Sequence, residues 1–191
     1  MSRIVEVPEQ ARCAEAATLL READCLFDAI AVQAAYAAIA VRLNADYAGK
    51  LPLILCVMNG GLYATSEITQ RLDFPFELDY LHATRYRGAT TGGGLIWKRQ
   101  PDAALEGRDV LVIDDILDEG HTLVAIRKAL MEFNPKSLKV AVLAEKLHDR
   151  RATEAHAEYI GLALPDRYVF GCGMDVRELW RQLPGIYAVK G

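Results

Sequence analysis

Three short, largely apolar runs restrict the fold of this chain more than any other feature. They are Pro52–Met58, Val110–Ile113 and Leu138–Ala144, each of the length of a buried strand. Stretches of helical content separate them, at Leu62–Leu72 and Leu123–Asn134. Strands that alternate with helices indicate a mostly parallel, twisted sheet flanked by helices. The predicted fold class is therefore α/β.

The other predicted elements fit the same plan. Residues Ala11–Ala48 are helical by content and form two helices that meet near Asp24–Phe27. Further strands are expected at Phe76–Ala83, Leu95–Lys98, Tyr159–Leu162 and Val169–Gly171. Between the first two lies Arg87–Gly94, rich in glycine and threonine, which we interpret as a mobile loop. No internal repeat or linker is visible, so residues 1–191 are expected to form a single domain.

Composition excludes several classes of function. The net charge of −4 argues against a nucleic-acid partner. The four scattered cysteines include no CxxC pair, which indicates reduced thiols and a cytoplasmic location rather than a disulfide framework or a zinc site. The opening segment MSRIVEVPEQ has no apolar signal core. The longest apolar run, Ala29–Val41, is too short to span a bilayer, so no membrane partner is expected.

An acidic segment follows the second apolar run, in the sequence VLVIDDILDEGHTL. Its carboxylates are Asp114, Asp115, Asp118 and Glu119, and Gly120 and Thr122 come directly after them. In parallel α/β sheets, ligands bind beyond the carboxyl ends of the strands. The segment occupies such a position, and so do Asn59-Gly60-Gly61 and Lys146.

Several interpretations of this segment compete. The carboxylates could be a solvated strand end, with Asp118 capping the next helix. A receiver-type acidic pair that holds magnesium would leave the glycine and the threonine unexplained. The nucleoside-triphosphate pattern GxxxxGK[ST] and the glycine-rich dinucleotide fingerprint are both absent here.

A sugar phosphate accounts for both halves of the segment. Vicinal hydroxyls are donors, and carboxylates are their natural acceptors. A monophosphate can bind the backbone N–H groups at a helix start and the Thr122 hydroxyl. Glycine at position 120 permits close approach of the backbone, and a magnesium ion on the ligand would make nearby acidic charge favourable.

The same residues carry a family resemblance. VLVIDDILDEGHTL resembles the phosphoribosyl-pyrophosphate motif of type I phosphoribosyltransferases: apolar strand, two acids, two apolar residues, Asp, any residue, Gly, any residue, Thr. From about Leu51 to the C-terminus the chain is similar to the 6-oxopurine branch of that family, the hypoxanthine-guanine phosphoribosyltransferases. The resemblance implies the fold of that family, in which segments 1–48 and 165–191 contribute a small hood beside the main sheet.

The resemblance also implies roles for the acidic segment. Asp114 and Asp115 would accept hydrogen bonds from the ribose hydroxyls. Asp118 would lie near N7 of the purine, either as general base or as the acceptor that orients N7. The 5'-phosphate would be wrapped by Glu119, Gly120, His121 and Thr122. 

Residues later in the chain would complete the purine end of the site. Lys146 would donate to the 6-oxo group, which favours oxo over amino purines. In LPDRYVFGCGMDVRELWRQL, the resemblance implies that Tyr168 stacks on the base and that the Val169 backbone meets its polar edge. Asp175 would ligate magnesium, and Arg181 would bind pyrophosphate.

Two further segments match the family, but each has one residue that differs from the usual one. Asn59-Gly60-Gly61 corresponds to the pyrophosphate loop, where the family tends to have lysine in place of Asn59, and the Met58–Asn59 peptide bond is expected to be cis. Arg85-Tyr86 resembles the start of the mobile catalytic loop, where the usual pair is Ser-Tyr. Tyr86 matches, and the loop would exclude water from the reaction.

The implied activity is transfer of 5-phosphoribosyl from phosphoribosyl pyrophosphate to N9 of hypoxanthine or guanine, with Mg²⁺ as cofactor, in a homodimer or homotetramer. Two alternatives stay open. One is a regulator of the same fold that senses phosphoribosyl pyrophosphate, although the acidic balance and the lack of an obvious DNA-binding segment disfavour it. The other is a transferase for xanthine or a pyrimidine. Histidines 82, 148 and 156 have no metal-ligand spacing and are assigned no role.

Overall fold

A six-stranded sheet forms the centre of this computed structural model, which describes residues 8–85 and 95–190. The strand order is β4-β3-β2-β5-β6-β7. The strands are β2 (Leu53–Val57), β3 (Glu77–Arg85), β4 (Leu95–Arg99), β5 (Asp109–Leu117), β6 (Ser137–Lys146) and β7 (Tyr159–Leu164). All neighbours pair in parallel except β3 and β4, which are antiparallel. A strand was thus predicted at the place of each of these six.

The strand order reverses between β2 and β5. From β2 the chain continues outward to β3, and from β5 it continues the other way to β6 and β7. The helices that follow β2 and β5 therefore diverge, and a crevice opens where the carboxyl ends of the two strands lie side by side. Leu53 pairs with Val110 and Cys56 with Ile113, so the turn after Val57 lies beside the start of the acidic segment.

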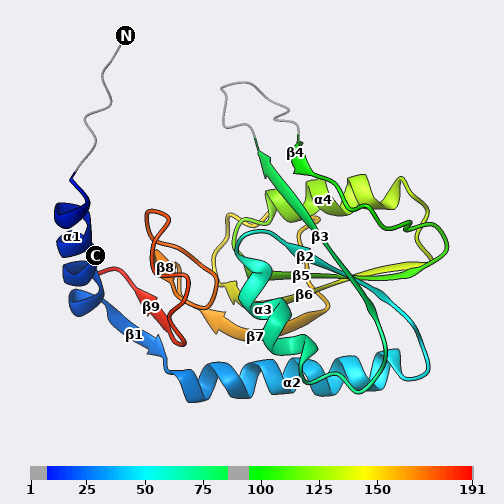
Figure 1. Cartoon of the computed structure of the whole chain (residues 1–191), viewed down its shortest axis with the longest axis horizontal. Coiled ribbons are helices and arrows are strands. Elements are labelled where there is room, and N and C mark those ends of the chain that lie inside the picture. Colours follow the sequence, from blue (N-terminus) through cyan, green and yellow to red (C-terminus); the bar gives the residue numbers. More distant parts are fainter. Residues whose placement is uncertain (1–7, 86–94, 191) are drawn as a thin grey trace, which may run out of the picture.

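Helices cover both faces of this sheet (Figure 1). The helices α2 (Ala29–Tyr47) and α3 (Gly61–Thr69) share one hydrophobic core with the sheet, and α4 (His121–Met131) shares the other. Strand β2 is buried over its whole length, because its side chains alternate between the two cores. This explains why its sequence is uniformly apolar rather than alternating.

A second, three-stranded sheet joins the two ends of the chain. Its order is β1-β9-β8, with β1 (Asp24–Phe27), β8 (Val169–Phe170) and β9 (Ile186–Ala188) all antiparallel. Figure 1 places it between the main sheet and helix α1 (Glu9–Glu22). This sheet is the expected hood, and the α/β fold class is confirmed.

The two helices predicted within Ala11–Ala48 are present as α1 and α2, but the junction between them was not predicted to be a strand. Residues Asp24–Phe27 form β1, because Cys25 pairs with Tyr187 of β9 at the opposite end of the chain. Strand β9 was not predicted at all. Pairing partners so distant in sequence leave no local pattern, and they outweigh the helical preference of the flanking residues.

Strand β5 extends further than predicted. We expected it to end at Ile113, but it continues to Leu117 because β6 pairs with it to the end, with Asp114 opposite Val142 and Leu117 opposite Glu145. The acidic pair is therefore part of a strand rather than of a loop. Helix α4 also begins two residues earlier than expected, at His121.

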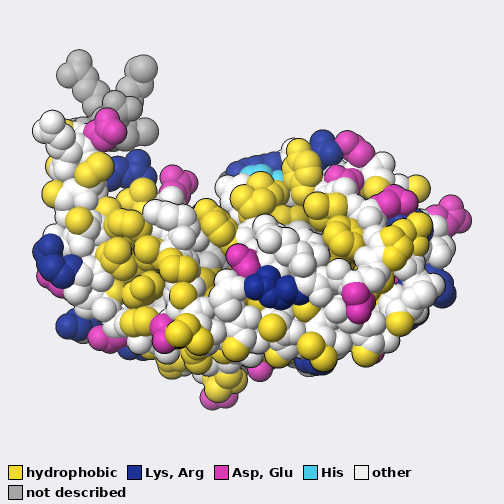
Figure 2. All heavy atoms as spheres, turned by 60° about the horizontal axis from the view of Figure 1, so that its bottom comes forward, with side chains coloured by type: hydrophobic (Ala, Val, Ile, Leu, Met, Phe, Trp, Pro, Cys, Tyr) yellow, Lys and Arg dark blue, Asp and Glu magenta, His cyan; other side chains and the backbone are white. Residues whose placement is uncertain are grey.

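Helix α2 has one buried and one exposed apolar face. Val32, Tyr36 and Ile39 are buried, whereas Ile30 and Val41 are 81% and 69% exposed. Figure 2 brings the α2 side of the molecule forward and shows apolar side chains gathered there, mainly toward the end near α1. No helix within the described ranges combines the length and the apolar character that a bilayer crossing requires.

The start of α2 offers a test of the fold. The Asp28 carboxylate accepts a hydrogen bond of 2.9 Å from the Ala31 backbone N–H, as an N-cap does. We expect Asp28→Ala to lower the free energy of unfolding by about 1 kcal/mol, which corresponds to a fall in Tm of roughly 2–4 °C. Asp28→Asn should retain most of the stability, because asparagine caps as well. Equal loss in both variants, measured by thermal unfolding, would contradict this account of the helix start.

Candidate functional site

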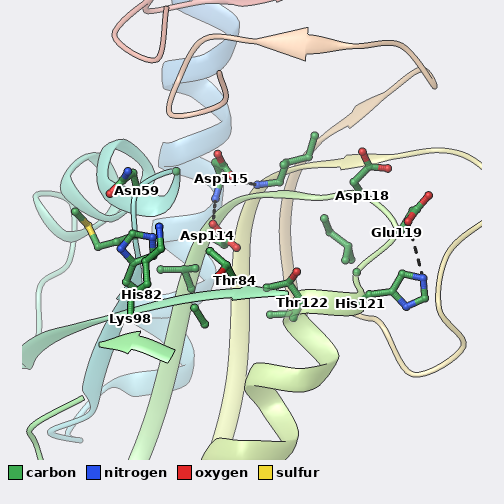
Figure 3. Close-up of a pocket in the computed structure, with 18 of the residues that line it drawn as sticks. Asn59, His82, Thr84, Lys98, Asp114, Asp115, Asp118, Glu119, His121 and Thr122 are labelled. Atoms are coloured by element: carbon green, nitrogen blue, oxygen red, sulfur yellow. Dashed lines mark hydrogen bonds and ion pairs between the residues drawn. The ribbon is translucent and has the colours of Figure 1, made fainter. Parts of the chain in front are cut away.

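A cavity of about 1120 Å³ lies at the carboxyl ends of β2 and β5, where the strand order reverses. Most of the residues singled out from the sequence line it: Asn59, Gly60, Asp114, Asp115, Asp118, Glu119, Gly120, His121, Thr122 and Arg181. Figure 3 shows three groups of side chains around it. Asn59, His82 and Lys98 lie at one end, Asp114 and Asp115 in the middle, and Asp118 to Thr122 at the other end.

The acidic pair is poor in partners and removed from water. Asp115 is only 8% exposed, and burial raises the pKa of its carboxyl group. Burial, followed by the charge of Asp115, raises the pKa of Asp114 well above its usual range. The hydrogen bonds given to the two carboxylates come from adjacent backbone N–H groups, at 2.9 Å from Asp115 and 2.7 Å from Ile116. Both carboxylates would gain from uncharged donors such as hydroxyl groups.

The turn after β2 lies directly against this pair. A Cβ atom on Gly60 would lie 2.1 Å from the Asp115 carboxylate, so only glycine fits there. The Met58–Asn59 peptide bond is cis, as predicted. Gly61 lies outside the cavity lining, at the start of α3. Asn59 and Gly60 themselves line the cavity beside the acidic pair.

The amino end of α4 faces the same cavity. Gly120 is its N-cap residue, in the left-handed conformation with φ +77°, and no described side chain caps the helix. The first N–H groups of the helix therefore need a partner from elsewhere, and they favour an anion. His121 and Thr122 form the first turn and line the cavity. This end of the site has the properties of a phosphate cradle.

Asp118 is held by two donors from the end of β6. The Lys146 ammonium lies 2.6 Å from Asp118 Oδ2, and His148 Nε2 lies 2.7 Å from Oδ1. Burial alone would raise the pKa of Asp118, but these two hydrogen bonds outweigh it and lower the pKa. The sequence analysis assigned no role to His148, whereas the structure places its side chain in contact with Asp118. Metal-ligand spacing was the wrong criterion for a residue that donates a hydrogen bond.

Asp175 and Arg181 pair with each other. The Arg181 guanidinium donates to Asp175 and, at 2.6 Å, to the Gly173 carbonyl, while the Glu178 N–H donates to the second Asp175 oxygen at 2.7 Å. Arg181 and Glu178 line the cavity, whereas Asp175 is not part of the lining. Within the described ranges, no three His, Cys, Asp or Glu side chains are arranged to hold a metal ion.

The predicted purine-contacting residues are not gathered around the cavity itself. Lys146 is 8% exposed, and its contact with the cavity lining is the hydrogen bond to Asp118. Tyr168, just before β8, is 55% exposed, and Val169 is buried in that strand. Tyr86 and the expected mobile loop Arg87–Gly94 lie outside the described residues.

Two basic residues of the cavity wall were given no role in the sequence analysis. His82 of β3 and Lys98 of β4 lie near Asn59 (Figure 3). The pairing of β3 and β4 shifts here, since His82 opposes Arg99 while Ala83 opposes Trp97. Lys98 is thus the extra residue of a bulge, and bulges commonly redirect a side chain into a site. Burial, with the Lys98 charge, lowers the pKa of His82.

Comparison with known proteins agrees with this fold. The family model of the phosphoribosyl transferase domain matches residues 22–177. The chain therefore belongs to the phosphoribosyltransferase family. It is 33% identical over 150 residues to a hypoxanthine-guanine phosphoribosyltransferase of Streptococcus thermophilus (strain CNRZ 1066), covering 78% of this chain and 83% of the relative. 

Two further relatives extend this similarity. A hypoxanthine-guanine-xanthine phosphoribosyltransferase of Tritrichomonas foetus is 33% identical over 152 residues, covering 80% of this chain and 83% of the relative. The crystal structure of a hypoxanthine phosphoribosyltransferase from Staphylococcus aureus superposes with a TM-score of 0.85 at 29% identity. That alignment covers 91% of this chain and 95% of the other. 

The Gly120 turn gives a testable consequence of this geometry. A Cβ at Gly120 would lie 2.3 Å from the Ala155 Cβ, whereas one at Gly107, with a similar φ of +69°, would meet nothing within 4 Å. We expect Gly107→Ala to cost about 1–2 kcal/mol, for the backbone conformation alone. Gly120→Ala should cost about 1–3 kcal/mol more, because Ala155 must move. Urea unfolding of both variants measures the difference, and equal losses would contradict a close-packed turn.

Proposed function

We propose that this protein transfers 5-phosphoribosyl from phosphoribosyl pyrophosphate to N9 of hypoxanthine or guanine, as a purine salvage enzyme. One observation carries the proposal. A desolvated carboxylate pair and an uncapped helix N-terminus face one cavity, which suits the alcohol groups and the phosphate of one sugar phosphate. The family membership supports the same reaction class.

The sugar phosphate would bind along the strand-to-helix segment. Asp114 and Asp115 accept hydrogen bonds from the ribose hydroxyls, which relieves their desolvation without adding charge. The 5'-phosphate binds the N–H groups of the segment Glu119–Thr122 and the Thr122 hydroxyl. Gly120 permits that approach.

The purine would occupy the side of the site near the end of β6. In the reaction, the bond from N9 to C1' of the ribose forms while the bond from C1' to the pyrophosphate oxygen breaks. The purine loses one proton from N7. Asp118, which its two donors keep ionised, accepts this proton. Lys146 then donates to the 6-oxo group, Tyr168 stacks on the base, and the Val169 backbone meets its polar edge.

The leaving pyrophosphate would lie at the opposite end, near Asn59. Permanent positive charge in the cavity lining comes from Arg181 and Lys98, set against five carboxylates. The backbone N–H groups of Asn59, Gly60 and Gly61 add dipoles where the family tends to have a lysine charge. Lys98, redirected by its bulge, is the substitute cation that we assign to this end.

Magnesium fits the donor set at this end. Mg²⁺ prefers oxygen ligands and binds through one or two carboxylates together with substrate phosphates. Asp175 offers such a carboxylate beside Arg181, and both are assigned to the pyrophosphate with its metal ion. The ion would neutralise the leaving group. Tyr86 and its loop are assigned to closure over this arrangement.

Self-association into a homodimer or homotetramer is the proposed assembly. The outer face of α2 supports it, because Ile30 and Val41 are exposed there together with the alanines of the same face. Exposed apolar surface of this kind marks protein contacts. Sedimentation equilibrium distinguishes a monomer from either assembly. A cytoplasmic location remains a prediction from the cysteine pattern.

The proposed reaction is tested by supplying phosphoribosyl pyrophosphate and Mg²⁺ with hypoxanthine, guanine, xanthine, adenine or uracil in turn. We expect nucleoside monophosphate and pyrophosphate with hypoxanthine and guanine, because Lys146 is a fixed donor for a 6-oxo group. Product with xanthine in preference to both would favour the xanthine alternative. Binding of phosphoribosyl pyrophosphate without product from any base would favour a sensing regulator.

Asp118→Asn tests the assignment of the base. We expect kcat to fall roughly 10²- to 10⁴-fold, because asparagine cannot accept the proton. The KM for phosphoribosyl pyrophosphate should change little, since the sugar and phosphate contacts lie on Asp114, Asp115 and the helix start. Asp73→Asn is the matched control, because it makes the same change at an exposed aspartate outside the cavity lining, and it should keep the wild-type kcat. Unchanged turnover in Asp118→Asn would remove Asp118 from the mechanism.

A further inference from the structure

His148 lies directly beside the proposed general base but belongs to no motif of the sequence analysis. It follows β6 by two residues, and only 3% of its side chain is exposed. Its Nε2 atom lies 2.7 Å from Asp118 Oδ1. A buried histidine with a short contact to a central acid is a specific structural element rather than a surface residue.

The backbone fixes which tautomer His148 adopts. The Arg150 backbone nitrogen lies 3.1 Å from His148 Nδ1. A backbone N–H can only donate, so Nδ1 must be the unprotonated acceptor. The ring proton is therefore on Nε2, where it points at the Asp118 carboxylate. His148 is thus a neutral donor, and a proton added at Nδ1 would face the Arg150 N–H.

Charged groups of both signs lie around His148. Lys146 already supplies one positive charge to Asp118, at 2.6 Å. Arg150 is paired with Asp166 at 2.7 Å, and Asp166 is the second carboxylate whose charge faces this region. A second full cation on Asp118 would weaken its ability to accept a proton, whereas a neutral donor orients the carboxylate without adding charge.

We propose that His148 is a positioning residue that holds Asp118 toward N7 of the purine while Lys146 turns to the 6-oxo group. This inference rests on the proposed function. In the ligand-free arrangement, each Asp118 oxygen has its own donor. When Lys146 donates to the purine, its hydrogen bond to Asp118 Oδ2 weakens. The hydrogen bond from His148 to Oδ1 then keeps the carboxylate in place. Precise orientation of a base strongly affects turnover.

A pair of amide variants separates this role from simple packing. The amide nitrogen of glutamine reaches the place of Nε2, whereas that of asparagine reaches only the place of Nδ1. We expect His148→Gln to keep kcat within about fivefold of the wild type, since the donor to Asp118 is retained. His148→Asn and His148→Ala should lose roughly 10- to 100-fold in kcat, the loss expected for a hydrogen bond to a charged group. The KM for phosphoribosyl pyrophosphate should stay within about twofold in all three.

His156 provides the matched control. Its ring is exposed and contacts Glu158 at 3.3 Å, so both amide replacements there should keep wild-type kcat. Equal kcat in His148→Gln and His148→Asn would overturn the proposal. A rise in KM with unchanged kcat would overturn it as well.

Nitrogen NMR of the wild-type protein tests the tautomer without any variant. At neutral pH, we expect the His148 Nε2 resonance at a protonated shift and Nδ1 at an unprotonated shift. The opposite tautomer, or a charged ring at neutral pH, would contradict the proposal even if the asparagine variant fails to fold. Wild-type protein that transfers phosphoribosyl to no base would instead defeat the proposed function and leave the tautomer result standing.

Discussion

The structure depends on one unfavourable arrangement, the placement of Asp114 and Asp115 side by side at the buried end of β5. Their pKa values rise because burial removes water and, for Asp114, because the neighbouring carboxylate repels its charge. Such a pair needs donors from outside the chain. The neighbouring turn leaves the pair accessible to such donors. Gly60 brings the backbone into contact with Asp115 but has no side chain that would cover the carboxylate.

A few residues later, the chain has the opposite requirement, because backbone N–H donors there need an acceptor. Helix α4 starts at His121, after its N-cap Gly120, and no side chain of the described residues caps its first N–H groups, which favour an anion. One short segment thus offers acceptors for hydroxyl groups and donors for a phosphate, and the reversal of strand order between β2 and β5 leaves room for a ligand that needs both. Asp118 lies in the same segment, in contact with Lys146 and His148, and in the proposed reaction it accepts the proton of the purine. Under that proposal, sugar-phosphate binding and proton transfer share one bend of the chain.

The sequence predicted what is local and failed where partners are distant. The buried strands β2 and β6 and the acidic segment were recognisable because apolar runs and a fixed spacing of Asp, Gly and Thr are local properties. Strand β1 was mistaken for a helix junction, and β9 was missed, because each depends on the other across the whole chain. Lys98 and His148 were missed for the same reason. One acts through a bulge between β3 and β4, and the other through contact with a strand end that lies far away in sequence.

The most direct test of the central claim is a crystal structure with a purine nucleoside 5'-monophosphate bound. The account predicts phosphate oxygens about 2.7–3.2 Å from the backbone nitrogens at the start of α4, with the ribose hydroxyls on Asp114 and Asp115. A phosphate bound at the Lys98 and Arg181 end, or a ribose that does not touch the acidic pair, would contradict it.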